Sequence, residues 1–259
     1  MDVGMPFLLE TETIEACCSL AQELGLRFVE LNANFPACEV SGLDPVHLHR
    51  LAAQYGLYFT LHVAEDLDPF AFNPAVRKAW LGTLRQSLLL ATAMEMPIVN
   101  MHFPKGVYIT LPGRRTYLYE RYADMLAQSV MELKEMAGEL LTGTKTHLVI
   151  ENTDGWAAHE QRAIAELLKS PVIGLTLDIG HSHAAGDADE AFFRRFPDKL
   201  MHMHGHDARG KSNHLALGDG EIDMRGRFRW AETCGARIVL ETKTIEALKA
   251  SVQRMPEFL

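Results

Sequence analysis

The residues with the most evident chemistry are histidines, aspartates and glutamates that close a series of short apolar runs. One segment, LMHMHGHDARGKSNHL at 200–215, contains four of the 12 histidines of the chain: His202, His204, His206 and His214. Imidazoles and carboxylates are the side chains with which proteins bind divalent cations. Carboxylates on two sides of a substrate can also take up and return a proton. The chemistry therefore depends on which of these side chains the fold brings together.

Six successive apolar runs end in, or carry near their end, a residue of a metal-binding type. These residues are His62, His102, Glu151, Asp178, His204 and Glu241, and His181 follows closely after Asp178. Taken singly, a buried histidine is usually a satisfied core group, and a carboxylate at a strand end usually caps the next helix. Three carboxylates and at least three imidazoles together, with no arginine among them, require a cation.

Strand alternation distinguishes the histidines of 200–215. His202, His204 and His206 share one face if the strand extends that far. His204 lies at the expected strand end, which favours it as the ligand, whereas His202 lies one layer deeper and is expected to fill the barrel interior with a hydrogen bond. His206 is expected to support the ligands from the loop, and His214 to reach back over the site. No role is assigned to four further histidines in helices or at strand starts, namely His47, His49, His147 and His159.

Eight apolar runs alternate with segments of helical periodicity. The fold that this alternation specifies must position the candidate ligands. The runs are residues 3–8, 26–31, 57–63, 97–103, 147–152, 172–180, 200–205 and 237–242. Most are nearly continuous in apolar residues, as in strands buried on both faces. The pattern predicts an α/β fold, a single (β/α)8 TIM-barrel domain over residues 1–259, with a doubly wound open sheet as the alternative. No glycine-rich fingerprint follows a run, which argues against a dinucleotide site.

Start and stop signals mark several of the intervening helices. Asp44-Pro45 and Asn73-Pro74 are good N-cap and first-turn pairs, and Gly25 and Gly56 are plausible C-terminal caps. The predicted helices are 13–25, 44–56, 73–96, 115–141, 158–170 and 244–255, with 224–235 as a short helix in the weakest, seventh unit.

Composition limits the class of protein. Apolar residues make up 47% and charged residues 23% of the chain, as in a soluble globular protein. No apolar run reaches the roughly 18 residues of a membrane span, the N-terminus lacks the features of a signal peptide, and the four cysteines fit no metal motif. A cytoplasmic protein is expected. The net charge of −9 argues against a broad nucleic-acid surface, although it leaves room for a local basic patch. A homo-oligomer stays compatible with the sequence.

These residues, in order and spacing, resemble the xylose-isomerase-like TIM-barrel superfamily, which joins sugar isomerases and epimerases to AP endonuclease family 2. The resemblance covers nearly the full chain. The sugar epimerase branch holds one divalent metal with Glu, Asp, His and Glu from the last four strands, which implies the ligands Glu151, Asp178, His204 and Glu241 here. The phrase LDIGH looks like that family's Asp-x-x-His, so His181 is implied to touch substrate. Arg209 is the nearest match to the basic residue that follows the metal histidine.

The endonuclease branch adds further implications. It uses three zinc ions with extra histidines on the third and fourth strands, where His62 and His102 lie here, so the resemblance implies a candidate second site of His62, His102, His181 and His214. Its LGEG turn looks like HLALGDG at 214–220, but the expected Asp-x-His reads Ser212-Asn213-His214, which puts a third metal in doubt. The early loop NANFPACEVSG also lacks the lysines and arginines that phosphate contacts require.

The leading expectation is an isomerase or epimerase of a sugar, sugar phosphate or polyol that depends on Mn²⁺, Zn²⁺, Co²⁺ or Mg²⁺. The metal would chelate a carbonyl and a neighbouring hydroxyl and stabilise an enediolate, while Glu151 and Glu241 move the proton. His62, His102, His181 and Arg209 are expected to contact this small carbohydrate-like substrate. One alternative is a zinc-dependent phosphodiesterase with a second ion roughly 3.5–4 Å from the first. The other is a non-catalytic metal- or ligand-binding barrel.

Overall fold

Eight parallel strands close into a barrel in the computed structural model, which describes residues 1–153 and 155–259. The barrel strands are β1 (Val3–Pro6), β2 (Phe28–Asn32), β3 (Tyr58–His62), β4 (Ile98–His102), β7 (His147–Glu151), β8 (Ile173–Asp178), β9 (Leu200–Gly205) and β12 (Arg237–Leu240). Each strand pairs with the next in chain order, and β1 pairs with β12 through Val3 opposite Ile238. The predicted (β/α)8 barrel is confirmed, and the open sheet is wrong.

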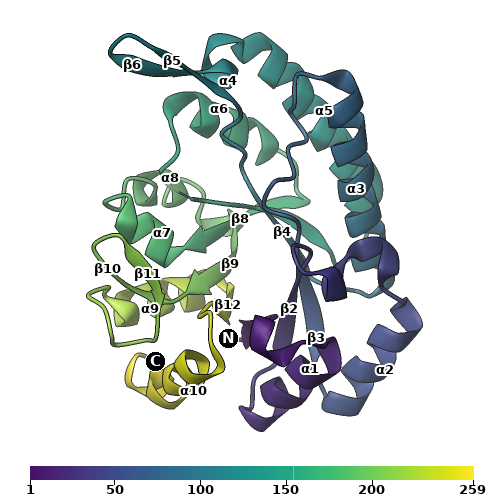
Figure 1. Cartoon of the computed structure of the whole chain (residues 1–259), viewed down its shortest axis with the longest axis vertical. Coiled ribbons are helices and arrows are strands. Elements are labelled where there is room, and N and C mark those ends of the chain that lie inside the picture. Colours follow the sequence, from purple (N-terminus) through teal and green to yellow (C-terminus); the bar gives the residue numbers. More distant parts are fainter. Residues whose placement is uncertain (154) are drawn as a thin grey trace.

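Helices surround the barrel (Figure 1). The longer ones are α1 (Ile14–Glu23), α2 (Pro45–Tyr55), α3 (Pro74–Ala93), α5 (Ala123–Leu141), α6 (Ala158–Leu167), α9 (Met224–Cys234) and α10 (Ile245–Arg254). Short helices are α4 (Leu118–Arg121), α7 (Ile179–Ala184) and α8 (Glu190–Phe193), and 3-10 turns are η1 (Leu9–Thr11), η2 (Pro36–Cys38), η3 (Val40–Gly42), η4 (Pro197–Lys199) and η5 (Met255–Glu257). As predicted, the Asp44 and Asn73 side chains accept hydrogen bonds from the first turns of α2 and α3.

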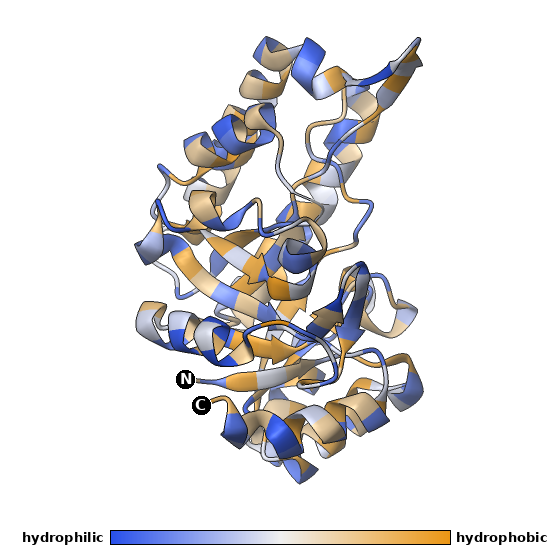
Figure 2. Ribbon diagram, turned by 90° about the vertical axis from the view of Figure 1, so that its left-hand side faces the viewer, coloured by the Kyte–Doolittle hydropathy of each residue, from blue (hydrophilic) through white to orange (hydrophobic). Residues whose placement is uncertain are grey.

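The core lies between the strands and the helices, while the barrel interior is markedly polar. Val29 and Leu31 of β2 are fully buried in the apolar cluster, as expected for side chains that face the helices. Glu30, between them, points the other way and contacts histidines of β9 across the barrel. In Figure 2, hydrophilic stretches interrupt the hydrophobic colour of the strands. The strands thus carry an apolar outer face and a polar inner face.

Two hairpins interrupt the strand–helix alternation. They are β5 (Tyr108–Leu111) with β6 (Arg114–Tyr117), and β10 (Asp207–Arg209) with β11 (Ser212–Leu215). The β5–β6 hairpin projects beyond the helices (Figure 1). The helix predicted over 115–141 is therefore wrong at its start, because its first residues pair with β5 across a turn at Gly113, whose φ is +78°. The short helix α4 follows the hairpin, and the long helix α5 begins at Ala123.

The strand predicted over 172–180 also ends earlier than expected. It stops at Asp178, whose side chain accepts a hydrogen bond from the His181 N–H and so caps α7. Among the described residues, no helix combines the length and apolar character that a membrane span requires.

Candidate metal centre

Four of the predicted ligands converge at the carboxyl ends of consecutive barrel strands. Glu151 ends β7, Asp178 ends β8, His204 lies on β9 and Glu241 directly follows β12. Asp178 and His204 are register partners on adjacent strands. One oxygen or nitrogen atom from each of the four side chains lies within 4.8 Å of the others. The structure thus assembles the set that the sequence indicated, at the end of the barrel where active sites of this architecture are built.

The Nδ1 atom of His204 faces all three carboxylates. It lies 2.9 Å from Oε1 of Glu151, 3.2 Å from Oε2 of Glu241 and 3.8 Å from Oδ2 of Asp178. This nitrogen is buried and makes no hydrogen bond within the described part of the chain. A buried imidazole nitrogen without a hydrogen bond, together with the surrounding carboxylate oxygens, makes up a set of ligand atoms that divalent cations prefer. These residues therefore fit a metal ion.

The charges of the cluster act strongly on one another. Burial alone would lower the pKa of His204, but the carboxylates of Glu151, Glu241 and Glu30 outweigh burial and raise that pKa well above its ordinary value. Burial alone would raise the pKa of Glu151 and of Glu241, but His204 above all lowers both. Glu151 and Glu241 are therefore held in their ionised form by the imidazole that faces them.

A second group of potential ligands shares Glu151 with the first. The Nε2 atoms of His62 and His102 lie 3.2 and 3.3 Å from Oε2 of Glu151. These three residues also meet the distance condition for a common ion. Burial lowers the pKa of His62, but its hydrogen bond and attraction to Glu151 prevail and raise it to about 9.

The candidate second site of four histidines is not one cluster. His62 and His102 lie beside Glu151, whereas His214 groups with His206 and Glu241. His181 belongs to none of the potential ligand groups of the described residues, although its ring centre is 5.6 Å from that of His214. The four histidines are therefore divided between two sides of the main cluster.

His206 is buried against the ligand cluster, in the supporting position that the sequence indicated. Its Nε2 lies 3.0 Å from Oδ2 of Asp178, and its Nδ1 accepts a hydrogen bond of 2.8 Å from the His214 backbone N–H. The proton of the neutral ring is therefore on Nε2 and is donated to Asp178. A β-carbon at position 180 would overlap the His206 ring, which explains the glycine of the LDIGH phrase.

A second layer of polar side chains lies inside the barrel beneath the ligands, and we call it the polar floor. Its members are Glu30, Thr60, Asn100, Thr176 and His202, all buried. Asn100 donates to Oε2 of Glu151 through its amide nitrogen and accepts from the Thr176 hydroxyl at 2.7 Å. His202 is in the deeper layer, as predicted, and contacts Glu30 at 2.9 Å.

Most of the polar floor was missed by reading only strand ends. Alternation offered a signal, because Thr60, Asn100, Thr176 and His202 each lie two residues before a predicted ligand or site residue. Glu30 gave the weakest signal, since the second strand has no ligand at its end. Burial by itself would raise the pKa of Glu30, but His204 and His202 outweigh it and lower that pKa below the ordinary range.

A family model described as xylose isomerase-like TIM barrel matches residues 18–258. The chain belongs to this family. An uncharacterized protein of Methanocaldococcus jannaschii is 27% identical over 217 residues, which are 81% of this chain and 80% of that protein.

Solved structures of similar fold cover the whole chain. A D-tagatose 3-epimerase-like protein superposes with a TM-score of 0.80 at 22% identity, covering 100% of this chain and 97% of its own. The 3-keto-D-glucoside 4-epimerase YcjR from E. coli, in its apo form, superposes with a TM-score of 0.77 at 15% identity. The match covers 100% of this chain and 98% of that chain. At these identities the likeness establishes the fold alone.

In this xylose isomerase-like barrel, the loop after β9 is held by a buried carboxylate that the sequence reading missed. Asp207 accepts hydrogen bonds from the backbone N–H groups of Gly218, Gly220 and Ile222 at 2.9–3.1 Å. A side chain at Gly220 would overlap this carboxylate, which accounts for the LGDG turn. Arg209 is exposed in the same loop, where its guanidinium donates to the Asp219 carbonyl at 3.0 Å.

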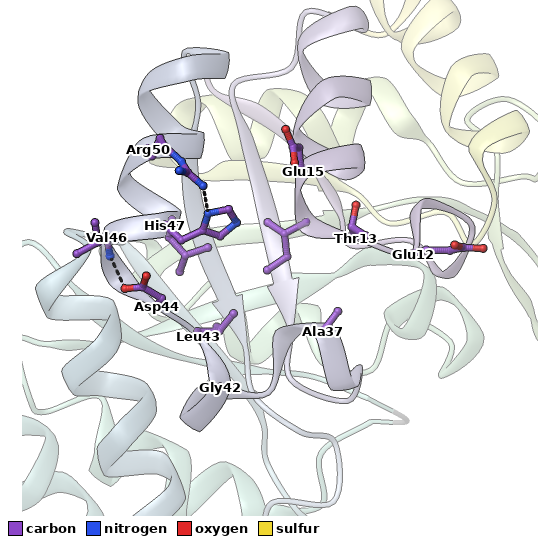
Figure 3. A pocket seen from close by; sticks show the side chains of 12 residues that line it. Glu12, Thr13, Glu15, Ala37, Gly42, Leu43, Asp44, Val46, His47 and Arg50 are labelled. Atoms are coloured by element: carbon purple, nitrogen blue, oxygen red, sulfur yellow. Dashed lines mark hydrogen bonds between the residues drawn. The ribbon is translucent and has the colours of Figure 1, made fainter.

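A separate cavity of about 640 Å³ lies outside the barrel interior, between the starts of α1 and α2 (Figure 3). Its walls include Thr13, Asp44 and His47, and Nδ1 of His47 contacts the Arg50 guanidinium at 2.7 Å. No proposed metal ligand lines it. In this xylose isomerase-like barrel, this cavity is therefore separate from the candidate metal centre.

Proposed function

We propose that this protein is a divalent-metal-dependent isomerase or epimerase of a sugar or a related polyol. The observation that carries the proposal is the unpaired, buried Nδ1 of His204 facing Glu151, Asp178 and Glu241. Membership of the xylose isomerase-like family and the fold shared with two proteins described as sugar epimerases support the same class.

The residues of the site would have distinct roles in the proposed reaction. A divalent cation held by the four ligands supplies Lewis-acid polarisation of a carbonyl and a neighbouring hydroxyl. Glu151 and Glu241 reach the site from β7 and from the end of β12, so one carboxylate can remove the proton next to the carbonyl and the other can deliver one. Lys243 Nζ lies 3.0 Å from Oε1 of Glu241 and restrains that carboxylate.

The histidines around the ligands complete the proposed site. His62, His102 and Asn100 hold Oε2 of Glu151, so this carboxylate keeps its orientation. His62, His102, His181 and Arg209 are proposed to contact the substrate hydroxyls. Three oxygen ligands and one nitrogen suit Mn²⁺, Mg²⁺ or Co²⁺, whereas the additional imidazoles favour Zn²⁺.

Solvent isotope exchange tests the proposal. Metal-free protein is loaded separately with each of these four ions and incubated in D₂O with a panel of ketoses and aldoses. Deuterium should appear by NMR at the carbon next to the carbonyl, together with the epimer or isomer, and a chelator should abolish both. Metal binding without exchange on any substrate of the panel would overturn the isomerase and leave a hydrolase or a non-catalytic metal-binding barrel.

One observation favours a second candidate function, a zinc-dependent phosphodiesterase. His62, His102 and Glu151 form a second ligand group that shares Glu151 with the first, as a two-metal hydrolase requires with ions roughly 3.5–4 Å apart. Metal counting by mass spectrometry separates the two: one ion per chain with isotope exchange supports the isomerase. Two zinc ions per chain with hydrolysis of bis(p-nitrophenyl) phosphate would support the hydrolase instead.

A further inference from the structure

Glu30 connects the polar floor directly to the proposed metal ligand His204. It lies on β2 with only 2% exposure and points into the barrel. Its Oε1 lies 2.8 Å from Nε2 of His204, and its Oε2 lies 2.9 Å from Nε2 of His202. The Thr60 hydroxyl donates to the same Oε2 at 3.1 Å. Both carboxylate oxygens are thus engaged by groups of the barrel interior.

This arrangement decides which nitrogen of His204 carries the proton when the imidazole is neutral, as it must be to bind a metal. An ionised carboxylate only accepts hydrogen bonds, so each imidazole must offer Glu30 an N–H at Nε2. A neutral imidazole then has its lone pair at Nδ1. In His204 this is the atom that faces Glu151, Glu241 and Asp178 without a hydrogen bond of its own.

We infer that Glu30 is the positioning residue of the metal centre. It holds His204 in the Nε2–H tautomer and in the ring orientation that presents Nδ1 to the cation. The inference deepens the proposed function and rests on its metal site. Glu30 itself lies behind His204 and touches no proposed substrate atom, so it acts through the imidazole.

A glutamine at position 30 would be a poor substitute despite its matching shape. It has one acceptor oxygen, whereas two imidazoles donate to Glu30, so one imidazole would lose its acceptor. If His204 loses it, the proton can move to Nδ1, which then points an N–H at the carboxylates and cannot bind a metal. If His202 loses it, moving the proton of His202 to Nδ1 gains no hydrogen bond, because this Nδ1 also has no partner among the described residues. His202 therefore competes with His204 for the single oxygen.

The test is the Zn²⁺ affinity of wild type and Glu30→Gln, measured by competition with a chromophoric chelator, together with the melting temperature of each metal-free protein. Glu30→Gln should bind Zn²⁺ about 10–100-fold more weakly, the usual effect of losing a carboxylate behind a ligating histidine. Glu160→Gln is the matched control, because Glu160 is a buried glutamate that caps α6 through the Ala157 N–H. Its Zn²⁺ affinity should equal that of wild type.

A second measurement needs no variant and therefore holds even if Glu30→Gln does not fold. Long-range ¹H–¹⁵N correlations of the Zn²⁺-loaded wild type report which nitrogen of His204 carries the proton. A proton on Nε2 supports the inference, and a proton on Nδ1 overturns it.

The two levels of the proposal fail separately. Wild type that binds Zn²⁺ while Glu30→Gln binds it equally well would overturn the role of Glu30 and leave the metal site standing. Wild type that binds none of Zn²⁺, Mn²⁺, Co²⁺ and Mg²⁺ would overturn the proposed function and this inference together.

Discussion

A histidine inside the barrel and a histidine on a helix are buried to a similar extent, but their pKa values shift in opposite directions. His62 in the barrel is 4% exposed and His159 in α6 is 6% exposed. Burial lowers the pKa of both, yet Glu151 raises that of His62 to about 9, while that of His159 stays lowered and its Nε2 has no partner among the described residues. For this pair, the carboxylate beside His62 rather than the extent of burial accounts for the difference in pKa.

His202 shows the limit of that rule. It contacts Glu30, but burial prevails and lowers its pKa. The carboxylate it contacts is shared with His204, whose ring also attracts the charge of Glu30. Although they share this partner, His202 therefore has a lowered pKa and His204 a raised one.

The largest expected effect comes from removing the carboxylates themselves. Glu151→Gln and Glu241→Gln should each lower turnover about 10²–10⁴-fold, because each is a proposed proton carrier. Both variants should remain folded, as judged by circular dichroism. Near wild-type turnover of either variant on a substrate of the native enzyme would remove that residue from the proton transfer.

His204→Ala should have the second largest effect, a loss of affinity for the main metal on the order of 100-fold. It deletes the nitrogen ligand outright, which should cost at least as much as loss of a supporting partner. Metal stoichiometry by mass spectrometry after dialysis provides the readout. His214→Ala is the control and should retain the main ion, since it affects at most a second ion or the substrate.

His202→Ala should lower the free energy of unfolding by about 1–3 kcal/mol while the metal stays bound, because it leaves a void and removes one hydrogen bond of Glu30. Denaturant unfolding of the metal-free protein and metal content are measured on the same sample. Loss of the metal from His202→Ala, with retention in His204→Ala, would place the ligand one layer deeper.

The smallest effects should come from the helix histidines. His47→Ala and His159→Ala should leave metal content and turnover unchanged. His159 titrates below its ordinary pKa of 6.5 in the folded protein, so the unfolded chain takes up a proton first as the pH falls. Its stabilising contribution is complete above about pH 6.5 and declines as the pH falls below it. Unfolding of His159→Ala should therefore depend less steeply on acid pH than that of wild type, which urea titrations at several pH values would reveal.

The barrel strands and the convergence of their polar end residues could be predicted because both depend on local patterns. A strand buried on both faces is nearly continuous in apolar residues, and the parallel order of strands brings their ends together. Glu151, Asp178, His204 and Glu241 were among the six residues at those ends, and the family resemblance, rather than their position, singled them out as a ligand set.

Features that depend on distant partners could not be read in the same way. The start of the segment 115–141 has helical periodicity, but its pairing with Tyr108–Thr110 prevails once Gly113 turns the chain. Glu30 is 174 residues from His204, so no spacing within the second strand indicates their contact. The division of the four outer histidines between two sides likewise depends on side-chain directions that type and spacing do not specify.

The close packing of Gly180 against His206 has an evolutionary consequence. Gly180 lies in helix α7, and the three atoms nearest to a β-carbon at this position all belong to the imidazole of His206. The two positions therefore form an epistatic pair: alanine at 180 becomes acceptable only after residue 206 has lost its ring. We therefore expect relatives that keep this histidine against Asp178 to keep the glycine with it, and an alanine at position 180 to follow, rather than precede, loss of the ring.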